Sequence, residues 1–391
     1  MDYWARAQEL ADDTIANRRH IHQHAEVGLD LPMTKAYVME KLKEYGLDPK
    51  ECGHGVTATL GKPGKCILLR ADMDALPMAE ESGEPFACAS GQAAHTCGHD
   101  FHTAMLLTAA RMLKESEQDL EGTVKFMFQP GEETFQGSRD MIENGILENP
   151  RVDVALGYHV SPGKMPIGLY MYNNKTNMMF SVDGFCIKIT GRGGHGAYPH
   201  MTIDPLNIAV NIYQALEAII AREADPAKAC VMTIGKIEGG TAPNLIPETA
   251  VLEGTIRTND AKARELLVRR MQEVSKAVAT TFGGQAEVEM LYEVPNLVCD
   301  PALTDEILGY MQAVGMPNAM PYPGVEASAS EDFACIAEKV PSVFMYLSAG
   351  YLDDRGQYMA HNPKAQFNEA VCPIGSAYYA HCAAAWLKNN Q

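Results

Sequence analysis

The sequence predicts an α/β fold in which a mostly parallel sheet is flanked by helices and a smaller unit is inserted into it. The chain has 391 residues, which exceeds the size of one ordinary hydrophobic core. Apolar strands and amphipathic helices alternate in the first half, an order typical of parallel sheets covered on both faces. From about Gly184 the order of elements changes, which indicates a second unit.

The elements of the first half can be placed from their hydrophobic patterns. Apolar runs bounded by turn residues predict strands, and apolar positions at helical spacing predict a helix. The predicted strands are 65–74, 122–130 and 152–160, and the helix that separates the first two is 101–116. In such sheets, ligands bind outside the carboxyl ends of the strands, so we expect a site there.

The order β-α-β-β-α-β in the middle of the chain predicts a unit of the ferredoxin-like type. Its predicted elements are the strand 184–193, the helix 204–224, the strands 229–240 and 247–258, the helix 260–283 and the strand 285–295. The sequence therefore predicts a first domain made of residues 1–183 and 298–391, with residues 184–297 as an inserted domain.

The composition limits the partners and the compartment. The hydrophobic share of 46% and the charged share of 21% are typical of a soluble globular protein. The formal net charge of −18 argues against nucleic acid or an anionic membrane as a partner. No apolar run approaches the roughly twenty residues of a membrane span, and the first residues lack the apolar core of an export signal. The ten scattered cysteines are expected to be reduced thiols, so we expect a cytoplasmic protein.

Four short segments concentrate side chains that bind metals. They are "CGHD" at 97–100, "GEE" at 131–133, "YH" at 158–159 and "AHNP" at 360–363. Thiolate, imidazole and carboxylate together suit Zn²⁺ or a similar first-row divalent ion. Residues two apart in a helix point about 200° apart, so we expect Cys97 and His99 to precede the helix if they share a site.

Glu132 and Glu133 stand side by side after a predicted strand. Adjacent carboxylates repel each other unless a cation lies between them or one is protonated. A division of roles resolves the conflict: one binds a metal, and the other stays free as a general base that takes a proton from an activated water. The alternative is a solvated surface pair, which their place at a strand end disfavours.

Simpler interpretations exist for the other candidates. His159 and His361, taken singly, are compatible with structural histidines, and Cys97 with a small buried residue. A cysteine nucleophile would need a base and an orienting partner that are normally remote in sequence, whereas the Cys-Gly-His tripeptide holds its groups close together. We therefore interpret Cys97 as a ligand. The histidine cluster "HIHQH" at 20–24 is interpreted as structural.

A series of motifs resembles those of one known family, both in their residues and in their order along the chain. The motifs are "RRHIHQHAE", "RADMDALPM", "HTCGHDFHTAMLL", "FQPGEE", "GYHV", "GRGGHGAYPH", "APNLIPETA", "GTIRT", "SEDFA" and "HNP". Together they resemble the amidohydrolase branch of the metal-dependent aminoacylase and carboxypeptidase family, which includes hippurate hydrolases, N-acetyl-amino-acid deacetylases and plant auxin-conjugate hydrolases. The similarity extends from about Arg18 to the last residue. It implies a zinc-exopeptidase-like first domain and makes the inserted domain a dimerisation or lid domain.

The resemblance also implies a two-metal site in each subunit, with Zn²⁺ or Mn²⁺ bound and Ni²⁺ or Co²⁺ as alternatives. Glu132 would be the general base and later the acid that protonates the departing amine. Asp74 would hold a metal-binding imidazole from behind, and Asp72 stands where other branches carry a histidine ligand but is not expected to bind. The implied ligands are Cys97, His99, Glu133, His159 and His361.

Three residues of the inserted domain match family positions that contact the substrate. His195 would reach into the site of a partner subunit and stabilise the oxyanion, so the resemblance implies a homodimer or a higher homo-oligomer. Asn244 and Arg257 would hold the substrate, Arg257 by pairing with its free carboxylate. The alternative for Arg257 is an ordinary surface cation on a strand.

The expected reaction is hydrolysis of the amide between an acyl group and the nitrogen of an amino acid. A dipeptidase or carboxypeptidase with the same chemistry is one alternative. A catalytically silent metal-binding protein is another, and the presence of Glu132 argues against it. The sequence departs from the family pattern at Ala25, usually proline, and at "TFQ" (Thr134, Phe135, Gln136), which we expect near the acyl or side-chain pocket.

Overall fold

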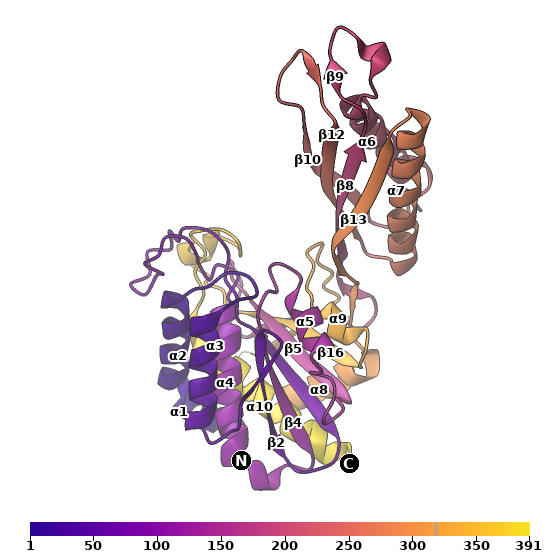
Figure 1. Ribbon diagram of the computed structural model, residues 1–391. Coiled ribbons are helices and arrows are strands. Elements are labelled where there is room, and N and C mark those ends of the chain that lie inside the picture. Colours follow the sequence, from indigo (N-terminus) through magenta and orange to yellow (C-terminus); the bar gives the residue numbers. More distant parts are fainter. Residues whose placement is uncertain (317–318) are drawn as a thin grey trace. The chain divides into compact units, whose positions relative to one another are not determined.

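The chain folds into two compact units, drawn in Figure 1. The computed structural model describes residues 1–316 and 319–391. The first unit consists of Met1–Met178, Val298–Glu326 and Asp332–Gln391, and the second of Met179–Leu297 and Ala327–Glu331.

The first unit is built on an eight-stranded sheet with the order β1-β2-β4-β3-β5-β16-β6-β15. Its central strands β4, β3, β5 and β16 run parallel to one another, which confirms the predicted α/β class. β3 and β4 are buried at every residue, as expected for strands covered on both faces. The strands are β1 (Lys50–Cys52), β2 (Gly55–Gly61), β3 (Cys66–Asp72), β4 (Thr123–Gln129), β5 (Val154–Ser161), β6 (Leu169–Tyr172), β15 (Met320–Pro323) and β16 (Ser342–Ser348).

Helices cover both faces of this sheet (Figure 1). On one face, α4 and α10 pack against each other and against β3, and α1 and α2 pack on them. On the other face, α5 packs on α9 and β4, and α9 packs on β16. The helices are α1 (Tyr3–Glu9), α2 (Ala11–Gln23), α3 (Pro32–Glu44), α4 (His99–Glu115), α5 (Gly137–Glu143), α8 (Pro301–Ala313), α9 (Ala334–Ala337) and α10 (Cys372–Asn389).

The second unit contains a four-stranded antiparallel sheet with the order β10-β12-β8-β13. Inward-facing residues alternate along its strands, and α6 and α7 pack on them to form a separate apolar core. Asp204 and Asp260 begin the two helices, because their carboxylates accept N–H groups of the first turn. The elements are β8 (Ser181–Thr190), β9 (Gly194–His195), α6 (Pro205–Arg222), β10 (Cys230–Gly239), β11 (Leu245–Ile246), β12 (Thr249–Thr258), α7 (Ala261–Thr281) and β13 (Gln285–Val294).

The predicted β-α-β-β-α-β order is therefore present, with the short pair β9 and β11 added to it. Two further short strands, β7 (Asn177–Met179) and β14 (Leu297–Val298), lie where the chain passes between the units. All ten cysteines belong to the described residues and are free. In the same part of the chain, no helix is long and apolar enough to cross a membrane.

Candidate functional site

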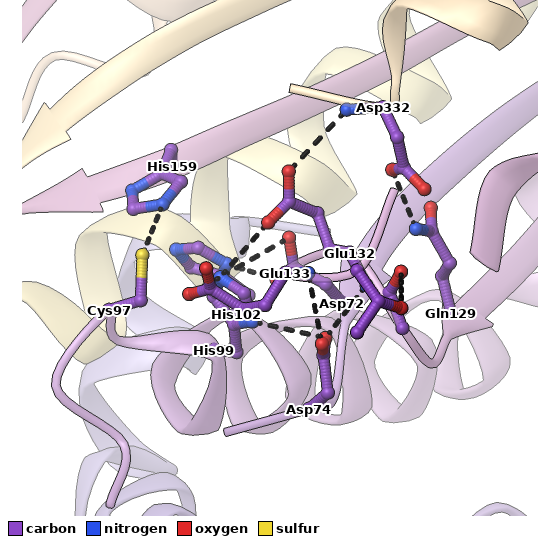
Figure 2. Close-up of polar contacts among 12 residues, drawn as sticks. Asp72, Asp74, Cys97, His99, His102, Gln129, Glu132, Glu133, His159 and Asp332 are labelled. Carbon is purple, nitrogen blue, oxygen red and sulfur yellow. Dashed lines mark hydrogen bonds and ion pairs between the residues drawn. The ribbon is translucent and has the colours of Figure 1, made fainter. Parts of the chain in front are cut away.

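The metal-binding side chains of the first unit come together at the carboxyl ends of its parallel strands. β3 ends at Asp72 and β4, its neighbour, ends at Gln129, so the loops that follow them start side by side. His159 lies near the end of β5, on the other side of β3. Figure 2 shows the carboxylates, the imidazoles and the thiol pointing toward one another.

Gly98 forms the turn between the first two candidate ligands. Its φ of +93° lies in the left-handed region, which glycine adopts without steric cost. A Cβ atom at this position would meet Val160 at 2.5 Å and the ring of Phe367 at 2.9 Å. The turn places Cys97 ahead of the helix, and His99 is the first residue of α4 rather than a residue before it.

Asp74 holds both the imidazole and the glutamate loop. Its Oδ1 atom lies 3.3 Å from Nδ1 of His99, so that this nitrogen carries the proton and Nε2 faces the centre of the site. The same carboxylate accepts the backbone N–H groups of Glu132 at 3.1 Å and of Glu133 at 3.0 Å. Asp74 therefore contacts the His99 imidazole and the backbone of both Glu132 and Glu133.

The candidate ligands form two sets that share Cys97. One set joins Cys97 to His99 and His159, and the other joins Cys97 to Glu133 and His361; in each set, the ligand atoms lie within 4.8 Å of one another. Ligands about 2.0–2.3 Å from one Zn²⁺ lie about 3–4 Å apart. The two sets are therefore compact enough to close on a cation with small movements of the side chains.

Nε2 of His99 and Oε1 of Glu133 are buried at the centre and lie 3.9 Å apart. Among the described residues, neither atom forms a hydrogen bond of standard geometry. Buried polar atoms are nearly always paired, and a divalent cation would give both atoms a partner. The donor set and its unpaired atoms thus fit the metal ions that the sequence predicts.

His361 differs from the other candidate ligands in its exposure and backbone. Its side chain is 54% exposed, and its Nε2 atom lies 3.4 Å from Oε1 of Glu133. Its φ of +67° is left-handed, which costs a non-glycine residue about 1–2 kcal/mol. The backbone N–H donates to the carbonyl of Thr96 at 3.0 Å. A strained residue held in this way is typical of functional sites.

The sequence profile of peptidase family M20/M25/M40 matches residues 68–385. The chain belongs to this family. It is 34% identical to the N-acetyl-L-cysteine deacetylase of Bacillus subtilis, covering 98% of this chain and 90% of that protein. It is also 34% identical to thermostable carboxypeptidase 2 of Saccharolobus solfataricus, covering 95% of each.

A solved structure agrees with the same assignment. The Bacillus subtilis YXEP protein, described as a dinuclear metal-binding peptidase of the M20 family, matches with a TM-score of 0.79 and 29% identity over 97% of this chain and 99% of that one. The predicted family and fold are thus confirmed, as is the prediction of a hydrolase.

Charge interactions shift several pKa values at the M20 centre. Burial opposes protonation of His99, but Asp72 and Cys97 outweigh it and raise its pKa well above the ordinary value. Close contact with Cys97 and Glu133 raises the pKa of His361 to about 10. Burial, with Glu133 beside it, raises the pKa of the Cys97 thiol. The anionic donors therefore attract positive charge, and a divalent cation would release these protons on binding.

In the second unit, His195 and Asn244 lie together at the pair β9 and β11. His195 pairs with Leu245, and the carbonyl of Asn244 accepts the N–H of Gly196 at 2.9 Å. Nδ1 of His195 accepts the N–H of Ala197 at 3.0 Å, so the proton of the neutral ring lies on Nε2. The exposed imidazole can therefore donate a hydrogen bond.

Arg257 lies far from these two residues within the second unit. β11 leads into β12 at Thr249, and Arg257 stands eight positions further along this strand, which is about 25 Å. The guanidinium is partly buried and donates to Thr255 at 3.0 Å. One subunit therefore does not bring His195 and Arg257 together.

Sequence reasoning left several polar residues of the first unit without a role. His102 donates from Nδ1 to Asp72 at 2.5 Å and accepts the N–H of Val160 at 2.8 Å, so both of its ring nitrogens are engaged. Arg70 and Asp332 are buried and paired at 3.1 Å. A charged residue inside the apolar run "CILLRAD", and the motif "SEDFA", were the only signals of this pair.

Proposed function

We propose that this M20 family member is a metal-dependent amidohydrolase that cleaves N-acyl amino acids into a carboxylic acid and a free amino acid. The observation that carries the proposal is the two sets of donors that share Cys97, with the buried carboxylate of Glu132 facing His99. The similarity to a protein named N-acetyl-L-cysteine deacetylase supports this class of substrate.

The ligands would be divided between two cations. Cys97, His99 and His159 would hold one, and Cys97, Glu133 and His361 the other. When bound, these ions would polarise the scissile carbonyl and acidify a water molecule. Zn²⁺ or Mn²⁺ fits the mixture of thiolate, imidazole and carboxylate, and Ni²⁺ or Co²⁺ is the alternative.

Glu132 is the proposed general base. Its side chain is buried, and its Oε2 atom faces Nε2 of His99 at 4.0 Å. The carboxylate takes a proton from the attacking water, whose oxygen bonds to the carbonyl carbon of the substrate. When the C–N bond breaks, Glu132 returns that proton to the leaving nitrogen, so the free amine departs neutral.

His195, Asn244 and Arg257 are the proposed substrate-binding residues of the inserted domain, residues 184–297, which would act as a lid on the catalytic domain (1–183 and 298–391). Nε2–H of His195 would donate to the oxyanion, and Arg257 would pair with the substrate carboxylate. Because Arg257 lies about 25 Å along β12 from the end of that strand that follows β11, one substrate would be held by Arg257 of its own subunit and by His195 of the partner subunit.

We therefore propose a twofold homodimer. β10 is an edge strand of ten residues in the second unit, and its Val231 and Ile237 are each 49% exposed. Unpaired edge strands are ready pairing surfaces, so β10 is the surface that we propose for subunit contact. A cytoplasmic location, where the ten thiols would stay reduced, completes the proposal.

A carboxypeptidase is the second candidate, because a relative with that name is equally identical to this chain. The two functions differ in the substrate nitrogen and acyl group: a dipeptide carries a free amine that needs an acidic partner. Purified protein supplied with Zn²⁺ or Mn²⁺ is assayed on matched N-acetyl, N-benzoyl and dipeptide substrates.

We expect free amino acid to be released fastest from the N-acyl substrates. Faster cleavage of dipeptides would favour the second candidate, and no hydrolysis of any substrate would contradict both. The Glu132→Gln variant, purified in parallel, is the control for contaminating hydrolases.

A further inference from the structure

Four buried polar side chains lie beside the glutamate pair, and the proposed reaction does not use them. Arg70 in β3, Gln129 at the end of β4, Ser138 in α5 and Asp332 ahead of α9 come from separate segments, and each is at most 1% exposed. We infer that this group, the Asp332 brace, positions the carboxylate of Glu132. The inference rests on the proposed function, in which Glu132 is the base.

The side chain of Asp332 is held by donors on both carboxylate oxygens. Oδ1 accepts from Arg70 at 3.1 Å and from Gln129 at 2.7 Å. Oδ2 accepts the backbone N–H of Ser138 at 2.9 Å. The Ser138 hydroxyl lies 3.2 Å from Oδ1 of Asp332 and 2.9 Å from Oε1 of Gln129. Because these contacts approach from different directions, the backbone at residue 332 is fixed.

That fixed backbone contacts the base directly. The N–H of Asp332 donates to Oε1 of Glu132 at 3.4 Å, whereas Oε2 of Glu132 faces His99, as Figure 2 shows. The two oxygens of the carboxylate thus have different surroundings: one faces an N–H donor, and the other faces the donor cluster. Rotation of the carboxylate out of this orientation would break the contact with Asp332.

Arg70 extends the brace to the ligand side of the site. Its guanidinium lies 2.6 Å from Oδ2 of Asp72, and Asp72 in turn lies 3.8 Å from Nε2 of His99. One rigid, planar group therefore joins the residue that holds the base to a carboxylate beside a proposed ligand. This connection would fix the distance between Glu132 and the cluster.

A purely structural role explains this arrangement less well. Buried ion pairs contribute little net stability compared with apolar residues of similar volume. Outer residues that orient reacting groups typically change activity about 10–100-fold when replaced. A positioning role therefore predicts a loss of turnover that is larger than the loss of stability explains.

The test compares two variants with a matched control. Asp332→Asn retains the backbone N–H but replaces one acceptor by an NH₂ group that faces other donors. Ser138→Ala removes only a hydroxyl from the brace. Ser376→Ala removes an equally buried hydroxyl that donates to Cys372 within α10 at 2.9 Å. The measurements are kcat and KM on the best N-acyl substrate, metal content and melting temperature.

We expect kcat of Asp332→Asn to fall about 10–100-fold, with KM and metal content close to those of the wild type. Ser138→Ala should show a smaller loss in kcat, and Ser376→Ala none, at similar melting temperatures. The inference would be overturned if the loss of kcat in the variants were proportional to their loss of bound metal. It would also be overturned if Asp332→Asn were as active as the wild type and Ser138→Ala had the same kcat as Ser376→Ala. If Asp332→Asn does not fold, the comparison of the two serine variants decides.

Crystal structures separate this inference from the proposed function. An inactive wild type on every substrate would contradict the proposed function, but the position of Glu132 in wild-type and Ser138→Ala crystals would still report on the brace. The inference would be contradicted, whatever the activity, if the Glu132 carboxylate had the same position in the variant crystals as in the wild type and were equally well ordered.

Discussion

The Sγ atom of Cys97 lies 3.2 Å from Nε2 of His159, although 62 positions separate the two residues. The orientation of the imidazole is fixed by its other nitrogen, which lies 2.6 Å from the carbonyl oxygen of Val160. Nδ1 therefore donates, and Nε2 presents its lone pair to the thiol side of the site. The contact joins the loop before α4 to the end of β5. The donor set of Cys97, His99 and His159 depends on this contact.

Replacement of Cys97 should affect both cations, because its sulfur belongs to both donor sets. We expect Cys97→Ala to lower the total metal content by more than His361→Ala does, and to reduce activity by about 100-fold or more. Metal analysis of the dialysed proteins checks this. Equal metal loss in the two variants would show that Cys97 serves one set alone.

Glu132→Gln should abolish turnover and leave metal binding intact. The amide has the shape of the carboxylate but cannot take a proton, and general base catalysis is worth about 10²–10⁴-fold. We expect kcat to fall by at least that factor, with an unchanged number of ions per chain. The parallel variant Glu133→Gln should instead lose metal, since its carboxylate belongs to the donor set with Cys97 and His361, whereas Glu132 belongs to neither set that contains Cys97.

His22 should make the stability of the fold depend on pH. Burial disfavours its charged form, but Asp100 and Glu80 outweigh burial and raise its pKa to about 9. Its contribution is therefore fully present below pH 6.5, the ordinary value, and is lost as pH rises through 9. We expect the gap in unfolding free energy between wild type and His22→Gln to shrink by about 3 kcal/mol over this range.

Denaturant titrations at several pH values measure that gap. His24→Gln, which alters an exposed histidine at the end of the same helix, is the matched control. A gap that stays constant, or that widens with pH, would contradict the assignment of a charged His22.

Mixed dimers test the shared substrate site. Homodimers of His195→Ala and of Arg257→Ala should each be inactive or nearly so. A heterodimer of the two retains one intact site, formed by Arg257 of one subunit and His195 of the partner subunit. Random mixing after dissociation should therefore restore about a quarter of wild-type activity, whereas sites contained in single subunits would restore none.

Local patterns were sufficient to predict part of the fold. The apolar runs and helical spacings predicted β3, β4, β5, α4 and the elements of the inserted unit nearly to their ends, whereas β16 and α10 were not predicted. The start of α4 was misplaced by two residues because the left-handed turn at Gly98 lets the helix begin directly at His99. Turns of this kind depend on contacts with Val160 and Phe367, which are remote in the sequence.

The site was predictable only in part, for a similar reason. Side chains that can bind metals are concentrated in short segments, so the sequence indicated Cys97, His99 and the pair Glu132 and Glu133. The Arg70–Asp332 pair joins positions 262 residues apart, so the charge within "CILLRAD" and the motif "SEDFA" did not indicate that the two residues meet. The sharing of Cys97 between two donor sets likewise follows from folding, because Glu133 and His361 arrive from separate loops.

The exposure of His361 makes the two halves of the metal centre unequal. Its side chain is 54% exposed, whereas that of His99 is fully buried. The ion beside His361 would be open to chelators, while the ion beside His99 would be sheltered until the protein opens. Removal of the metal ions by a chelator, and their rebinding, should then each occur in two kinetic phases. The fast phase should be absent in His361→Ala. In a medium poor in metal, this protein would accordingly lose one ion first and stay half-loaded, still folded around the other.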